Sequence, residues 1–108
     1  MKRYAAIKLI FPSGMGLQYQ VVEVDKKGRP LCCYPLCGEQ HSTEWLPGVL
    51  LFSPLQLCTD DLNNWDGVLE KMNTSTYAKV EVFILYHIDL FDMQQMKPMN
   101  GGKLKQLL

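Results

Sequence analysis

The segment that most constrains the fold runs from Tyr77 to His87. Its residues alternate between polar and apolar at first, and then four apolar residues follow one another at positions 83–86. A strand that is apolar on both faces needs cover on both faces, as strands inside a sheet have. The segment therefore predicts a central β-strand with other strands of the sheet beside it.

Five other segments also have the character of strands. Residues 3–11 alternate well, whereas the alternation over 17–24 slips at Val21 and Val22, which predicts a bulge or burial of both faces. The remaining strands are expected at 30–36, 49–53 and 103–108, with edge positions for the first and last of these. The pattern predicts a mainly β fold, mostly antiparallel, that is either a β-sandwich or a partly open small barrel.

A single short helix is expected around residues 60–73. Its apolar residues recur at helical spacing and fall on one face: Leu62, Trp65, Val68, Leu69 and Met72. Trp65 is therefore predicted to be a buried core anchor. Trp45 follows a polar loop and is predicted to be more exposed. Residues 89–99 are expected to form a short turn or helix, stopped by a proline.

Composition narrows the functional class. The chain has 108 residues, which fits a single β-rich domain spanning 1–108. Eleven basic residues balance eleven acidic ones, so the chain has no electrostatic footprint for nucleic acid, and no apolar run approaches the length of a membrane span. The basic start of the chain lacks the cleavage site of a signal peptide. These features predict a cytoplasmic protein with reduced thiols, and neither a nucleic-acid nor a membrane partner.

Metal-ligating residue types recur at a spacing of four in Cys33, Cys37 and His41, and Cys58 is a fourth candidate. Thiolates and imidazole suit zinc, so a small thiol- or zinc-dependent enzyme built on these four residues is one hypothesis. Structural zinc sites, however, have two close ligand pairs, and the chain has only half of that pattern. Cysteine as a small apolar residue is the commoner role. The favoured prediction is therefore no metal, no cofactor and no catalytic residue.

The first half of the chain contains four motifs in a fixed order. They are a strand from Tyr4 to Phe11, the segment Val21 to Asp25, the pair Gly28-Arg29 and the turn Leu46-Pro47-Gly48-Val49. This order, over about residues 3–55, resembles the small β-domain that opens the metal-dependent amidohydrolases. The resemblance implies that domain's architecture, with residues 77–108 supplying the strands that return after the catalytic barrel.

The metal-binding His-x-His pair of that family is absent. Five and seven residues beyond Gly48 the chain has Ser53 and Leu55, and neither can replace an imidazole ligand. A complete catalytic barrel also needs about 250 residues. The resemblance therefore implies the accessory domain without the enzyme. The predicted function is a non-catalytic accessory or protein-interaction module.

An interaction surface is predicted from apolar residues that have no evident cover. Methionines make adaptable binding faces, and an unguarded apolar strand end packs on its own core, a second copy of the chain or a partner. Covering by a second copy favours a homodimer, and a larger protein partner is the alternative. The candidate residues are Trp45, Met93, Met96, Met99, Leu107 and Leu108.

Overall fold

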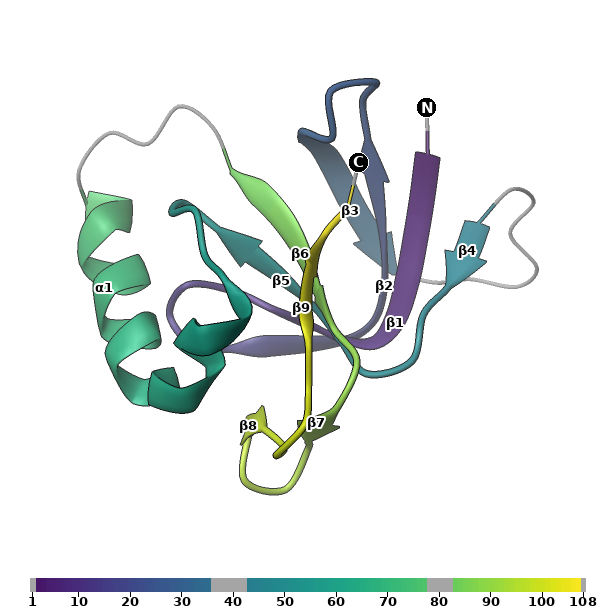
Figure 1. Ribbon diagram of the computed structural model, residues 1–108. Coiled ribbons are helices and arrows are strands. Elements are labelled where there is room, and N and C mark those ends of the chain that lie inside the picture. Colours follow the sequence, from purple (N-terminus) through teal and green to yellow (C-terminus); the bar gives the residue numbers. More distant parts are fainter. Residues whose placement is uncertain (1, 36–42, 78–82, 108) are drawn as a thin grey trace.

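The computed structural model of the chain describes residues 2–35, 43–77 and 83–107. These residues form a mainly β fold, mostly antiparallel, with one helical region, as the sequence predicted (Figure 1). The strands of the main sheet are β1 (Lys2–Ile10), β2 (Gly16–Val24), β3 (Pro30–Pro35), β4 (Thr43–Trp45), β5 (Val49–Ser53), β6 (Ile84–Ile88) and β9 (Leu104–Gln106). The helical region is η1 (Thr59–Asn64), a 3-10 turn, followed by α1 (Trp65–Tyr77).

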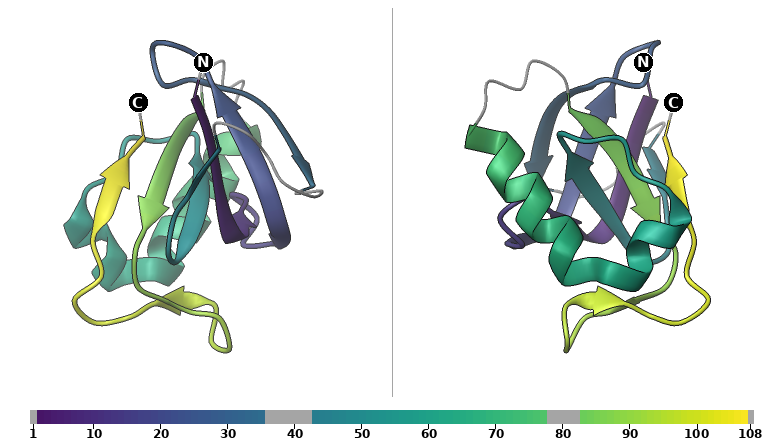
Figure 2. Two further views of the ribbon diagram at one scale, coloured as in Figure 1. Left: turned by 90° about the vertical axis from the view of Figure 1, so that its right-hand side faces the viewer. Right: turned by 60° about the vertical axis from the view of Figure 1, so that its left-hand side comes forward.

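The main sheet is open, with β3 and β9 at its two edges. Its strand order is β3-β2-β1-β5-β6-β9, and β4 pairs with β1 beside that path. The first half of β1 pairs in parallel with β4, and its second half pairs in parallel with β5; the other neighbours are antiparallel. The two halves of β1 therefore belong to two layers, which Figure 2 shows from the side.

Strand β1 changes its inward face where the sheet bends. Tyr4, Ala6 and Leu9 all belong to one buried cluster between the layers. Ala6 and Leu9 are an odd number of positions apart and would lie on opposite faces of a flat strand. The strand therefore coils between them. Tyr19 of β2 lies opposite this part of β1, between the residue pairs Ala6–Gln20 and Lys8–Gln18, and has a φ of 53°.

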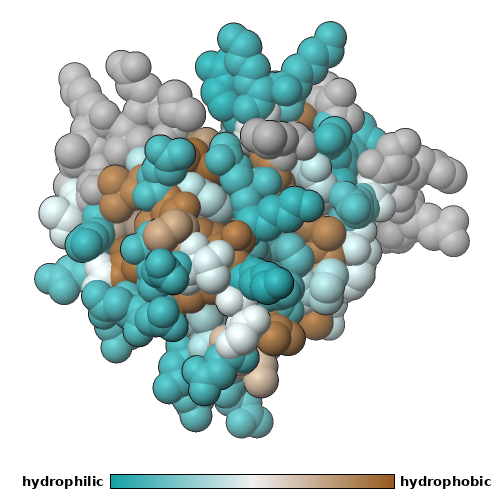
Figure 3. Space-filling model, viewed as in Figure 1, coloured by the Kyte–Doolittle hydropathy of each residue, from teal (hydrophilic) through white to brown (hydrophobic). Residues whose placement is uncertain are grey.

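The core has two parts. One lies between the layers and contains residues from both, including Val22, Leu50 and Leu85. The other lies between the sheet and α1, where Val68 and Met72 of the helix pack on residues of β5 and β6. In the view of Figure 3, apolar surface gathers between α1 and β9, with hydrophilic side chains around it. None of the helices in the described ranges is long and apolar enough to cross a membrane.

The prediction for residues 77–87 was wrong at its start. Tyr77 ends α1, residues 78–82 lie outside the described part of the chain, and the strand begins at Ile84. Its predicted place inside the sheet is confirmed, because β6 lies between β5 and β9. Residues 89–99 do not form a helix; they contain a small hairpin of β7 (Phe91–Asp92) and β8 (Lys97–Pro98) joined by a turn.

Candidate interaction surface

One layer of the sheet, made by β3, β2, the first half of β1 and β4, carries a row of four paired residues, one from each strand. Tyr34 of β3 pairs with Val21 of β2, Val21 with Ala5 of β1, and Ala5 with Trp45 of β4. Residues paired across strands lie on one face. Ala5 lies on the face opposite to its neighbours Tyr4 and Ala6, which point between the layers. The row therefore lies on the face of these strands that points away from the buried cluster between the layers.

Two aromatic rings stand exposed at one end of this row. The rings of Tyr19 and Trp45 are stacked, with centroids 6.4 Å apart and planes 24° apart. Their side chains are 51% and 49% exposed, whereas Ala5 and Val21 beside them are fully buried. The rings therefore stand on a closely packed floor. We call the surface made by Tyr19, Trp45 and Tyr34, with Arg3 at its border, the aromatic face.

Trp45 is positioned by backbone pairing of β4 with β1. Three residue pairs join these strands in parallel, and the N–H of Leu46 donates to the carbonyl oxygen of Ala5 at 2.8 Å. This pairing connects residues about forty positions apart in the sequence. The indole is therefore carried by the sheet itself and not by a free loop.

Tyr19 is held in a backbone conformation that costs energy. Its φ of 53° is in the left-handed region, where a residue with a side chain costs about 1–2 kcal/mol. Glycine would allow the same bend in β2 without that cost. The side chain of Tyr19 is half exposed, so burial of its ring in the core does not account for this conformation.

A polar network borders the aromatic face. Glu23 Oε1 accepts hydrogen bonds from Arg3 Nε at 2.8 Å and from the Tyr34 hydroxyl at 3.1 Å, and its Oε2 accepts one from the Cys32 thiol at 3.4 Å. The bond from Arg3, followed by that from Cys32, lowers the pKa of Glu23. Partial burial raises the pKa of Cys32 and of Tyr34, and the hydrogen bond to Glu23 raises both pKa values further. The network holds Arg3 and Tyr34 in place at the border.

The network predicts how the Cys32 thiol reacts. Replacing Glu23 by glutamine removes a carboxylate that disfavours the thiolate, so the pKa of Cys32 falls and its alkylation near pH 8 becomes faster. The rate is measured by peptide mass spectrometry after timed treatment with iodoacetamide. The exposed thiol of Cys58 serves as an internal reference because it has no contact with Glu23. An unchanged ratio of Cys32 to Cys58 modification in Glu23→Gln would contradict the proposed network.

The structure does not bring the described members of the suggested zinc site together. Cys33 lies exposed on β3, and Cys58 lies exposed at the start of η1, on the other layer. Cys37 and His41 lie outside the described residues, so the hypothesis that involves them stays untested. Among the residues whose positions are described, no group of three or more His, Cys, Asp or Glu side chains is placed to hold a metal ion.

The predicted interaction residues have separate positions in the fold. Trp45 and Met99 are exposed, whereas Met93 and Met96 are partly buried against the core under α1. Leu107 does not belong to an exposed surface, because it is only 5% exposed and packs in the core between the layers. Its backbone N–H donates to the carbonyl oxygen of Leu85 at 2.9 Å. Leu108 lies outside the described residues.

The sequence did not reveal that Tyr19, Tyr34 and Arg3 would join Trp45. Alternation along β2 places Tyr19, Val21 and Glu23 at every second position, which is a local signal. The pairing of β4 with β1 leaves no such signal, because it is a contact between distant segments.

Comparison with known proteins adds no family assignment. No family model matches the sequence, and searches of curated proteins and of solved structures found no similar protein. The resemblance to amidohydrolase β-domains therefore stays a prediction from the order of four short motifs.

Proposed function

We propose that this chain is a non-catalytic interaction module that binds a protein partner through its aromatic face. The observation that carries the proposal is the exposed Tyr19–Trp45 pair, held on a packed sheet by strand pairing and by a strained backbone. Trp, Tyr and Arg are the residue types that most often dominate protein interfaces. Trp and Tyr also lose little conformational entropy on binding, because each has only two side-chain torsions.

We take the partner to be a different protein, because the ground for predicting a second copy of the chain does not hold. The prediction of a homodimer rested on an apolar strand end that needed cover, and Leu107 is covered by its own core. Tyr19 and Trp45 of the aromatic face, by contrast, remain about half exposed. The proposed partner therefore supplies the surface that covers these two rings.

The proposal is tested by recovering partners of the tagged full chain from its own cell. Trp45→Ala removes the larger ring, and Tyr19→Asn removes the other ring while keeping a residue that tolerates the left-handed conformation. Each substitution should weaken the affinity for the partner about thirtyfold, which corresponds to the loss of about 2 kcal/mol expected at an interface hot spot. Less partner should therefore be recovered. Because both rings are half exposed, the fold should survive both changes.

The matched control is Leu90→Ala, which shortens another exposed apolar side chain outside the aromatic face. It should leave recovery unchanged. If Met99→Ala abolishes partner recovery and Trp45→Ala does not, the partner contacts Met99 and the proposal is wrong. Equal recovery with the unchanged chain and with Trp45→Ala would also contradict it.

A further inference from the structure

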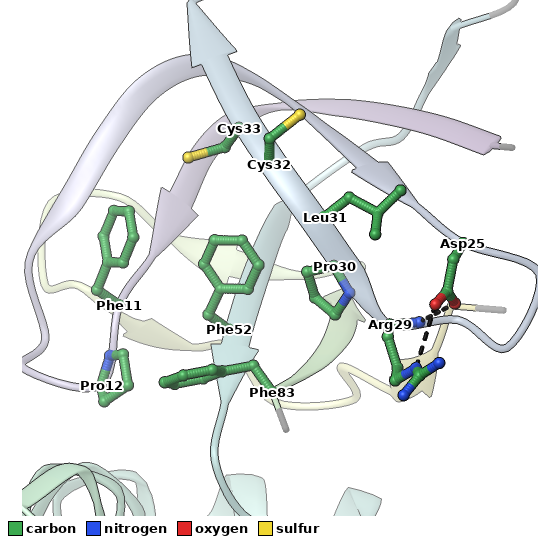
Figure 4. Close-up of a pocket in the computed structure, with 10 residues that line it drawn as sticks. All are labelled: Phe11, Pro12, Asp25, Arg29, Pro30, Leu31, Cys32, Cys33, Phe52 and Phe83. Atoms are coloured by element: carbon green, nitrogen blue, oxygen red, sulfur yellow. Dashed lines mark hydrogen bonds and ion pairs between the residues drawn. The ribbon is translucent and has the colours of Figure 1, made fainter. Parts of the chain in front are cut away.

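A second feature of the molecule is a cleft that opens between the two layers beside β3. Its volume is about 660 Å³, within the range of about 300–1,000 Å³ typical of small-molecule sites. It lies on the inner side of the sheet. None of the three aromatic residues of the aromatic face, Tyr19, Tyr34 and Trp45, lines it. The lining residues are Phe11, Pro12, Asp25, Arg29, Pro30, Leu31, Cys32, Cys33, Phe52 and Phe83 (Figure 4).

One side of the cleft is a wall of three phenylalanine rings. Phe11 follows β1, Phe52 lies in β5 and Phe83 precedes β6. The ring centroids of Phe11 and Phe52 are 5.6 Å apart, and those of Phe52 and Phe83 are 6.4 Å apart in an edge-on arrangement. All three side chains remain partly exposed. Partly exposed rings that converge on a concave site offer apolar area for a ligand to bury.

The other side of the cleft has a cationic rim. Asp25 and Arg29 line the cleft, and Arg29 Nε donates to Asp25 Oδ2 at 3.1 Å. Asp25 Oδ1 also accepts from the backbone N–H groups of Lys27 and Arg29, both at 2.9 Å. These bonds, that from the Arg29 backbone foremost, lower the pKa of Asp25 and satisfy its charge locally.

Arg29 retains binding capacity after this pairing. Its terminal guanidinium nitrogens donate to no residue in the part of the chain that is described. The turn 25–29 contains Lys26, Lys27 and Arg29 against the single carboxylate of Asp25, which makes its net charge +2 (three minus one). A guanidinium with free donors in a net positive turn suits a carboxylate.

We propose that this cleft binds a small amphipathic carboxylate, with its apolar body against the Phe11–Phe52–Phe83 wall and its carboxylate on Arg29. The size of the cavity, the apolar wall and the charge at the rim together select this class of ligand. The site is separate from the aromatic face, so its failure would leave the proposed function unaffected.

The binding test compares decanoate with decanol, which share the alkyl chain and differ in charge, by titration calorimetry on the full chain. Decanoate should bind at least about tenfold more tightly, the effect expected of a hydrogen bond to a charged group. Arg29→Gln should remove this preference, and Arg29→Lys should restore part of it. Lys71→Gln, which removes an exposed charge on α1, should preserve it. Phe83→Ala should weaken both ligands by about tenfold.

A second readout uses the Cys33 thiol, which lines the cleft and points toward the rings in Figure 4. Bound decanoate should slow alkylation of Cys33 while leaving the exposed Cys58 unaffected. This readout decides the matter in the unchanged chain if Phe83→Ala fails to fold. Absence of decanoate binding, equal binding of decanoate and decanol, an unchanged preference in Arg29→Gln, or no protection of Cys33 would each overturn the proposal.

Discussion

Replacing Trp65 by alanine is expected to lower the free energy of unfolding by about 3–5 kcal/mol. The side chain is only 6% exposed and packs edge-on against Phe91, with ring centroids 5.7 Å apart. Its indole N–H donates to the carbonyl oxygen of Met96 at 3.1 Å, so the substitution also leaves that acceptor without its partner. A domain of this size is stabilised by about 5–15 kcal/mol in total, so the loss is a large fraction.

Chemical denaturation of Trp65→Ala and Trp45→Ala measures this difference. Trp45 is half exposed and its ring stacks on that of Tyr19, so its replacement should cost about 1 kcal/mol. Both variants remove the same side chain, which makes them a matched pair. Equal costs, or a larger cost for Trp45→Ala, would show that α1 is not packed on the sheet through Trp65.

Replacing Gly48 by alanine is expected to cost about 3 kcal/mol or more. The φ of Gly48 is +82°, which disfavours any residue with a side chain. A Cβ atom there would also lie 2.0 Å from the carbonyl oxygen of Ile88 and 2.8 Å from that of Asp89. Both contacts are with backbone, so β5 and β6 would have to separate at this end.

Gly101→Ala is the control for Gly48→Ala. Gly101 has nearly the same φ, +84°, but a Cβ atom there would have no neighbour within 4 Å. Its replacement should therefore cost only the conformational term of about 1–2 kcal/mol. The difference between the two variants in urea denaturation isolates the close approach of Gly48 to β6. Equal costs would mean that the turn and β6 are not in contact.

Local patterns were sufficient for most of the individual elements. Alternation located β1, a short apolar run after a turn located β5, helical spacing placed Trp65 on the buried face of α1, and the polar loop before Trp45 indicated its exposure. These features depend on residues close together in sequence, where the side-chain period of a strand or a helix is directly visible. The mainly β class followed from the number of such segments.

Features that depend on distant contacts were not predicted. The pattern over 77–87 was interpreted as one strand, although Tyr77 belongs to α1 and the strand β6 begins at Ile84. Apolar residues occur both in short strands and at the end of an amphipathic helix, so the pattern alone does not separate the two. The strand end at Leu107 gave no local sign that its own core would cover it. The cleft draws its rings from three separate elements, Phe11, Phe52 and Phe83, so no segment of the sequence contains its pattern.

The central claim is that a protein partner covers the aromatic face, and site-specific photo-crosslinking tests it most directly. A benzoylphenylalanine residue in place of Tyr34 puts the reactive group on the aromatic face and leaves Tyr19 and Trp45 intact, and the same residue in place of Leu90 puts it on an exposed apolar position elsewhere. After irradiation in the protein's own cell, the chain modified at position 34 should form one predominant crosslink to another protein, and the chain modified at position 90 should not. Absence of a crosslink at position 34, with or without one at position 90, would contradict the account.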